Sequence, residues 1–346
     1  MHTHHKCRCH YIPPHIMTKL AKTTDESIRE TARISAVQAK ASRVSRTRKT
    51  ERGITTLGAT GGEGKRLVYD SQNTTEMRKE LVREDGGIVT GDAVADRVFD
   101  FAGTVRDFYR RLERNSIDGN GMDIIMNIHY GQNYMNAFWD GDEMTFGEGD
   151  GQIFSDFTDS LDVVAHELTH GVTQHTANLD YYSQSGALNE HFSDVFGSAI
   201  QQAANGQDAG QADWLIGNEL MGPTLYGESL RSMMAPGSAY QNDLLGVDPQ
   251  PAHMRDYYDG PADNRGVHIN SGIPNRAFYL VATDIGTDKA VQIWYQGLRM
   301  LWPTADFNDA VDVLANAART LTLHGKVSEG STQTVRLAFK DVGLPV

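Results

Sequence analysis

The chain has 346 residues and a formal charge of −13. At the usual domain size of about 150 residues, this length suggests two domains. The acidic balance argues against a nucleic-acid-binding surface. The 39% hydrophobic and 22% charged residues are typical of a folded globular protein. No apolar run reaches the length of about 18 residues that a membrane span requires.

The charge is distributed unevenly. Residues 1–52 carry 12 basic and 4 acidic side chains, a charge of +8, whereas residues 53–346 carry 20 basic and 41 acidic ones, a charge of −21. This basic leader lacks the apolar core of about 7–15 residues that marks a secretory signal. Its arginines and serines leave a mitochondrial-type transit peptide as an alternative. Both cysteines, Cys7 and Cys9, lie in the leader, and we read them as reduced thiols.

The predicted elements follow in chain order. Residues 18–50 are predicted to form a helix followed by an exposed, Arg-rich linker that includes residues 43–52. Glycine-rich turns and short strands are expected over 53–90, including a strand at 66–69. Apolar residues at helical spacing predict a helix over 92–114, and residues 122–130 are typical of a buried strand.

The second half is predicted to be mainly helical. The acidic stretch 140–151 lacks the ligand spacing of an EF-hand loop and is interpreted as a hairpin connection. Helices are then expected at about 160–177, 187–204, 271–285, 288–301, 306–323 and 329–341. The change in composition near residue 155 indicates a boundary between a strand-rich half and a helical half.

The segment DVVAHELTHG at 162–171 contains a pattern typical of zinc enzymes. His166 and His170 are four residues apart, so on a helix they share one face. Two imidazoles on one face can bind Zn²⁺, and Glu167 beside them can act as a general base on a water molecule. The alternative is a helix whose histidines are ordinary polar groups.

A third ligand is available on the next predicted helix. Glu190 follows His170 after 19 intervening residues, which leaves room for a turn and a returning helix. Its carboxylate would complete a His₂Glu set with the fourth position open. Asp194 lies one turn beyond Glu190, where it can accept the second ring N–H of a ligand histidine.

Over residues 65–345 the sequence resembles the thermolysin-like zinc endopeptidases. The resemblance rests on HELTH, GALNE, NAFWDG at 136–141, ESLRSM at 228–233 and DNRGVHINSG at 263–272. It implies an α+β fold of two lobes, a strand-rich N-terminal lobe and a mainly helical C-terminal lobe, with the active-site cleft between them. The expected divisions are a prosegment at 1–52, the N-terminal lobe at 53–158 and the C-terminal lobe at 159–346.

The resemblance implies catalytic roles for individual residues. His166, His170 and Glu190 would bind one catalytic zinc ion, whose bound water Glu167 would activate. His268 and Tyr181 would hydrogen-bond the oxyanion of the tetrahedral intermediate, and Asp263 would orient His268.

The resemblance also implies substrate-binding roles. Asn136 and Ala137 would bind the substrate backbone, and Arg231 would bind a substrate carbonyl. An apolar primed-side pocket would be lined by Phe154, Phe157, Val163, Ile216 and Leu230. We therefore expect cleavage on the amino side of Leu, Ile, Val or Phe. The bulk of Phe157 favours a shallow pocket.

The sequence departs from many relatives at the positions that match a double calcium site. These positions are Asp162, Gln201, Asp213, Leu215 and Asn218, and only two of them are acidic. A hard dication needs several oxygen ligands, preferably anionic ones. We expect the double site to be absent or reduced to one weak calcium site.

The leader resembles the short prosegments of the protealysin-like subgroup, with YIPPHIM at 11–17. The resemblance implies a removable inhibitor, and Cys7, Pro13, Pro14 and Ile16 are the candidate inhibitory residues. The sulfur of Cys7 or Cys9 could approach the zinc, or the Pro-Pro segment could block the cleft sterically. Autolysis is expected near residues 48–58.

These observations predict a zinc-dependent neutral endopeptidase that is made as a zymogen and acts on proteins and peptides. The rivals are a zinc-stabilised binding module without activity, which the presence of Glu167, Tyr181 and His268 disfavours, and a metal-dependent enzyme acting on non-peptide substrates. We expect a monomer with no nucleic-acid or membrane partner. The family is mostly secreted, whereas the leader shows no signal, so a cytoplasmic zymogen with non-classical release is the alternative.

Overall fold

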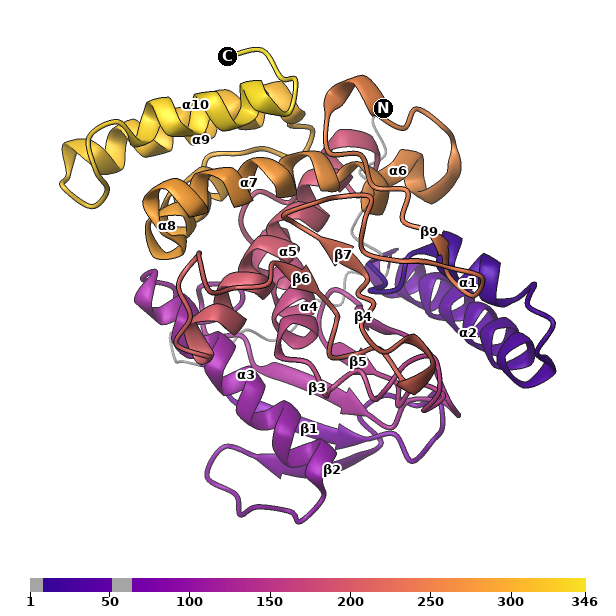
Figure 1. Ribbon diagram of the computed structural model, residues 1–346. Coiled ribbons are helices and arrows are strands. Elements are labelled where there is room, and N and C mark those ends of the chain that lie inside the picture. Colours follow the sequence, from indigo (N-terminus) through magenta and orange to yellow (C-terminus); the bar gives the residue numbers. More distant parts are fainter. Residues whose placement is uncertain (1–8, 52–63) are drawn as a thin grey trace.

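The computed structural model describes residues 9–51 and 64–346 (Figure 1). Its N-terminal half contains a five-stranded sheet in the order β2-β1-β3-β5-β4. The strands are β1 (Arg66–Asp70), β2 (Glu80–Glu84), β3 (Ile124–Ile128), β4 (Ala137–Trp139) and β5 (Met144–Phe146). β1, β3 and β5 are parallel neighbours, whereas β2 and β4 are antiparallel edge strands. All five residues of central β3 are buried, as expected for a strand covered on both faces.

Helix α3 (Ala93–Arg111) packs against this sheet. It begins after Asp92, whose side chain accepts hydrogen bonds from the N–H groups of Val94 and Ala95, and this capping satisfies two of the free donors at the helix start. Its buried residues lie at helical spacing, which confirms the predicted helix over 92–114.

Two helices form the centre of the molecule, α4 (Leu161–Gln174) and α5 (Ser183–Ala204). Figure 1 shows them between the sheet and the C-terminal helices. Residues 161–173 of α4 are all buried, and α5 is buried over most of its length. Because both helices are covered on every side, even their polar residues must find partners inside the protein.

After α5, residues 205–261 contain only short strands and 3₁₀ turns, and five helices follow. The helices are α6 (Ala262–Asn270), α7 (Gly272–Ile285), α8 (Thr287–Leu298), α9 (Phe307–Leu323) and α10 (Ser331–Asp341). Two-residue strands β6 (Leu215–Ile216) and β7 (Arg231–Ser232) pair, as do β8 (Gln241–Asn242) and β9 (Gly246–Val247). The 3₁₀ turns are η1 (Pro223–Leu225) and η2 (Met254–Asp256).

The leader forms α1 (Pro14–Leu20) and α2 (Glu26–Glu51), which lie together at one side of the body (Figure 1). The prediction of a linker at 43–52 is wrong for residues 43–51, which continue α2. This stretch contains no Gly or Pro and has three arginines and a lysine, so nothing in it stops a helix and several residues favour one. Residue 52 lies outside the described part of the chain.

The helix predicted from residue 18 is interrupted, because α1 ends at Leu20 and α2 begins at Glu26, and α6 was not predicted. The other sequence predictions agree with the structure. The strands at 66–69 and 122–130 and the six C-terminal helices are present, with ends shifted by up to about four residues, a common error for boundaries. The hairpin predicted at 140–151 is present, but its turn is short and residues 144–146 form β5. The α+β division into a strand-rich and a helical half is confirmed.

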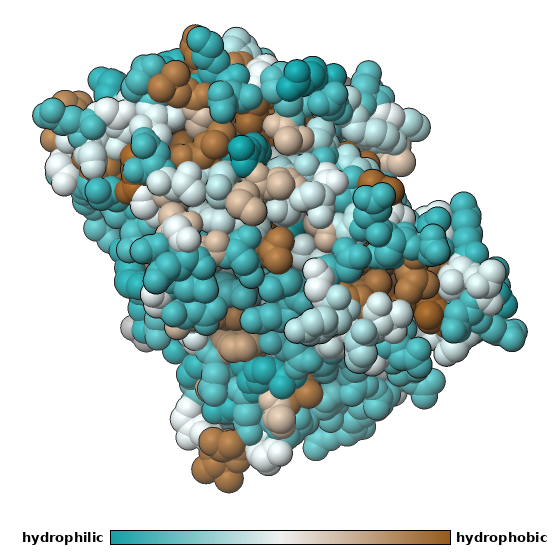
Figure 2. Space-filling view, viewed as in Figure 1, coloured by the Kyte–Doolittle hydropathy of each residue, from teal (hydrophilic) through white to brown (hydrophobic). Residues whose placement is uncertain are grey.

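The surface seen in Figure 2 is mainly hydrophilic, with small apolar patches. No helix among the described residues is both long and apolar enough to cross a membrane.

Candidate active site

Contact between α4 and α5 brings together the three side chains that the sequence selects as metal ligands. The Nε2 atoms of His166 and His170 are 3.0 Å apart. Glu190 lies 3.4 Å from each of them, through Oε2 to His166 and through Oε1 to His170. All three residues are buried, so their ligand atoms meet in the interior of the protein.

The outer ring nitrogens of both histidines have protein partners. His166 Nδ1 lies 2.9 Å from Asp194 Oδ1, as predicted. His170 Nδ1 lies 2.9 Å from Asn189 Oδ1 and 3.1 Å from the Ser193 hydroxyl. Sequence reasoning missed both partners of His170, although Asn189 is part of GALNE. Such partners fix the ring orientation and leave Nε2 free for a metal.

The donor set fits a zinc ion. Glu190 Oε2 is buried without a hydrogen-bond partner, although a buried carboxylate oxygen normally has one. Two inward-facing imidazole nitrogens and a carboxylate match the ligands of catalytic Zn²⁺ sites. His166 and His170 also form a potential metal-binding group with Glu167, and His170 and Glu190 form one with Cys9. The short distances among His166, His170 and Glu190 make these three a suitable ligand set.

Glu167 lies beside this group on α4. It is completely buried, and neither of its carboxylate oxygens has a hydrogen-bond partner among the described residues. Burial, assisted by the negative charge of Glu190, raises the pKa of Glu167 to about 8. A carboxylate in this state is suited to accept and release a proton near neutral pH.

His268 and Tyr181 lie next to Glu190, with His268 Nε2 3.6 Å from Glu190 Oε1. The Tyr181 hydroxyl donates to Glu190 Oε1 and lies 3.1 Å from His268 Nε2. Asp263 Oδ1 accepts a hydrogen bond from His268 Nδ1 at 2.6 Å, and Asp263 Oδ2 accepts one from the His268 backbone N–H at 2.8 Å. Burial alone would lower the pKa of His268, but the negative charges of Asp263 and Glu190 together raise it above its ordinary value. The structure thus brings together all three residues that the resemblance selected.

A buried ion pair connects this region to Arg231. Its Nε and Nη2 donate to Asp194 at 2.9 and 2.8 Å, and Asn275 Nδ2 donates to the same carboxylate at 2.9 Å. Burial would raise the pKa of Asp194, but the positive charge of Arg231 lowers it to about 2. Arg231 Nη1 is buried without a partner and remains available to an additional acceptor. The sequence did not predict Asn275 or the pairing of Arg231 with Asp194.

Three consecutive residues of the leader lie in this site. The Tyr11 N–H donates to the Ala137 carbonyl at 3.0 Å, and the Ile12 N–H donates to Asn136 Oδ1 at 2.9 Å. The His10 carbonyl accepts from His268 Nε2 at 3.0 Å. His10, Tyr11 and Ile12 were not among the predicted inhibitory residues.

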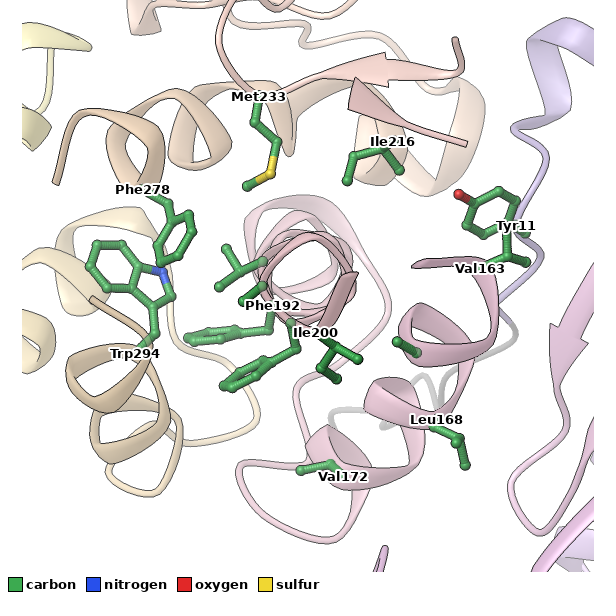
Figure 3. Packing of buried hydrophobic residues seen from close by; sticks show 14 of the residues in the cluster. Tyr11, Val163, Leu168, Val172, Phe192, Ile200, Ile216, Met233, Phe278 and Trp294 are labelled. Atoms are coloured by element: carbon green, nitrogen blue, oxygen red, sulfur yellow. The ribbon is translucent and has the colours of Figure 1, made fainter. Parts of the chain in front are cut away.

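The predicted pocket residues lie in the same hydrophobic cluster as Tyr11, and Phe154, Phe157, Val163 and Leu230 are all buried. Figure 3 shows Tyr11 on the same side of the core as Val163 and Ile216. The Tyr11 side chain is completely buried, and its ring meets that of His166 edge-on at 5.0 Å.

Within the described part of the leader, the residues that were predicted to be inhibitory are not the ones that contact the site through their backbone. Pro13 is buried and Pro14 partly so, while Ile16 is buried in the core cluster. Cys7 lies outside the described residues. The Cys9 sulfur is within 4.8 Å of ligand atoms of His170 and Glu190, but it is disulfide-bonded. The interpretation of Cys9 as a reduced thiol is therefore wrong, and in this state its sulfur is not the thiolate that zinc binds.

Some side chains at the positions that match the calcium site already form hydrogen bonds within the protein. The buried Asp162 carboxylate accepts from the Ser160 hydroxyl and, at 2.7 Å, from the Gly217 N–H. Asn218 Nδ2 donates to Asp213 Oδ2 at 3.3 Å. All three of these carboxylate oxygens thus accept hydrogen bonds from the protein itself.

Comparison with known families matches almost the whole chain. The model described as "Thermolysin metallopeptidase, catalytic domain" matches residues 22–174, and "Thermolysin metallopeptidase, alpha-helical domain" matches residues 177–344.

Individual proteins give the same result. The chain is 45% identical to an extracellular metalloprotease of Pectobacterium carotovorum, over 86% of this chain and 87% of that protein. It is 39% identical to thermolysin of Alicyclobacillus acidocaldarius, over 80% of this chain and 50% of that one. The precursor of protealysin from Serratia proteamaculans superposes with a TM-score of 0.87 at 40% identity, covering 97% of this chain and all of that one.

Proposed function

This chain belongs to the thermolysin family of metalloendopeptidases, and on that premise we propose that it is a zinc-dependent neutral endopeptidase made as a zymogen. The observation that carries the proposal is the convergence of His166, His170 and Glu190, with the unpartnered carboxylate of Glu167 beside them. The thermolysin-like fold is confirmed by the superposition.

One zinc ion would be held by His166 and His170 through Nε2 and by Glu190 through its carboxylate. Zinc in such a site polarises the peptide carbonyl and makes a water molecule acidic enough to deprotonate near pH 7. Asp194 and Asn189 keep the two imidazoles in the tautomer that presents Nε2 inward.

Glu167 accepts the proton of the attacking water and later delivers it to the leaving amine. Its burial and lack of a competing hydrogen bond support this role. His268 Nε2 and the Tyr181 hydroxyl are neighbouring donors that would stabilise the developing oxyanion. Each such donor typically contributes about 10²–10³ in rate, and Asp263 holds His268 in position.

The substrate backbone would pair with Ala137 and Asn136 at the edge of the sheet, and Arg231 Nη1 would bind a substrate carbonyl. The apolar pocket around Val163 and Leu230 favours cleavage on the amino side of bulky apolar residues. In a peptide library, comparable cleavage before Asp or Lys would contradict this specificity.

The leader would act as the inhibitor of the same site. Its support is the occupation of Ala137, Asn136 and His268 by residues 10–12. A substrate cannot use these groups until the leader leaves. We propose a prosegment at 1–52, an N-terminal lobe at 53–158 and a C-terminal lobe at 159–346. We also propose that the prosegment is cleaved off near residues 48–58, although α2 extends to residue 51.

We further propose a monomer whose double calcium site is absent or reduced to one weak site. The support is that Asp162 accepts hydrogen bonds from the protein at both oxygens. The Pectobacterium relative is named extracellular, which supports secretion, with non-classical release of a cytoplasmic zymogen as the alternative.

Casein hydrolysis separates an enzyme from a zinc-stabilised binding module. The zinc-loaded full-length chain should hydrolyse casein after processing, and a zinc chelator should abolish this. Glu167→Ala should lose at least about 10³-fold in rate, because it removes the base and proton carrier, while still binding one zinc per chain by metal analysis. Hydrolysis that persists in Glu167→Ala would refute the mechanism.

A further inference from the structure

The leader residues in the cleft are held as a peptide substrate would be. β4 is an edge strand, so its outer backbone groups can pair with an added extended segment. The N–H groups of Tyr11 and Ile12 occupy the Ala137 carbonyl and the Asn136 side chain. These are the two residues to which we assign the substrate backbone.

The carbonyl of His10 marks the position of the reacting bond. Its oxygen is 3.0 Å from His268 Nε2, and the same nitrogen is 3.1 Å from the Tyr181 hydroxyl. Both groups are the proposed oxyanion donors. The next residue, Tyr11, lies against His166 with ring centroids 5.0 Å apart. The peptide bond that joins His10 to Tyr11 is therefore the leader bond that lies between the donors and the metal-binding helix.

The side chain of Tyr11 shows what the pocket beyond this bond accommodates. It is completely buried, and the Arg231 guanidinium lies 5.2 Å from the ring centroid. Gly217 borders its hydroxyl: a Cβ at this position would lie 3.0 Å from the Tyr11 oxygen and 3.0 Å from Leu230 Cδ1. The absence of a side chain at Gly217 thus makes room for a para-hydroxyl.

We propose that the bond between His10 and Tyr11 is bound in substrate register and is hydrolysed by the chain's own active site, whose pocket accepts tyrosine after the cleaved bond. This inference rests on the proposed function. The oxygen of water bonds to the His10 carbonyl carbon, and the bond from this carbon to the Tyr11 nitrogen breaks. Glu167 transfers both protons of the water, one after the other, to the leaving amine, so that His10 ends as a carboxylate and Tyr11 as a protonated amino terminus.

The position of cleavage can be read directly. Full-length protein is incubated with one equivalent of zinc, and its fragments are identified by mass spectrometry. We expect a product beginning at Tyr11, at a rate independent of protein concentration. Tyr11→Phe should keep this cut. Tyr11→Asp should slow it by about 100-fold or more, because the pocket cannot solvate a charge. Glu167→Ala should show no cut.

A second readout does not depend on catalysis. In the full-length Glu167→Ala protein, amide hydrogen exchange should be slow at Tyr11 and Ile12, and Tyr11→Asp should accelerate it. Lys19→Ala, at an exposed position of α1, should leave both the exchange and the cut unchanged.

Three outcomes would contradict the inference, each in a different way. If casein is hydrolysed and the chain is cut elsewhere while no terminus appears at Tyr11, the register is wrong but the proposed function stands. If the zinc-loaded protein cuts neither casein nor itself, the proposed function fails as well. Fast exchange at Tyr11 and Ile12 in Glu167→Ala would also contradict the register.

Discussion

Each histidine of α4 presents one ring nitrogen to a fixed partner and the other to the space shared with Glu190. Asn189→Ala removes the partner of His170 that sequence reasoning missed. We expect zinc affinity to fall by about 10–100-fold, measured by competition with a chromogenic chelator. Asn205→Ala, at the exposed end of α5, is the control. Equal affinity in both variants would show that Asn189 does not position the ligand.

The pairing of His268 with Asp263 leads to a prediction about the pH dependence of activity. Burial lowers the pKa of His268, but the negative charges of Asp263 and Glu190, with Asp263 first, together outweigh this effect and keep the imidazole protonated at higher pH. Asp263→Asn should therefore move the alkaline limb of kcat/KM to lower pH, because His268 loses its proton earlier. The profile is compared with that of Asp259→Asn, an exposed carboxylate paired with Arg265. An unmoved alkaline limb would exclude His268 as the titrating donor.

At the scale of elements, the long helices could be predicted because their apolar spacing and caps are local properties of the sequence. The two-residue strands could not, since β6 and β7 exist only through pairing with each other. The same distinction applies to the site. Spacing alone placed His166, His170 and Glu190 on two helices, whereas the contact of Tyr11 with His166 joins residues far apart in the chain. No local pattern encodes that contact.

In the loop that follows β5, the backbone of Gly147 lies very close to the backbone of Tyr134. A Cβ at Gly147 would lie 2.0 Å from the Tyr134 carbonyl oxygen, and the Gly147 N–H donates to the Asn136 carbonyl at 3.1 Å. Gly147→Ala should lower the free energy of unfolding by about 1–3 kcal/mol, because backbone must move to relieve the clash. Chemical denaturation of Gly210→Ala, whose nearest neighbour would be 3.4 Å away, provides the control. Equal stability of the two variants would contradict the close approach.

At the scale of the whole molecule, we predict that stability depends little on calcium. EGTA should leave the melting temperature of the zinc-loaded protein unchanged, since Asp162 takes its hydrogen bonds from Ser160 and Gly217. Differential scanning calorimetry with and without added calcium tests this expectation. A steep loss of melting temperature in EGTA that calcium reverses would show that the double site is retained.

The burial of Tyr11 against His166 also affects the kinetics of metal exchange. An ion bound by His166, His170 and Glu190 would leave only when the leader opens, so its residence time would be set by that opening. A chelator should then strip zinc from the intact protein at a rate independent of chelator concentration, and faster once the leader is gone. The segment that keeps substrate out would thus also retain the metal while the enzyme is dormant.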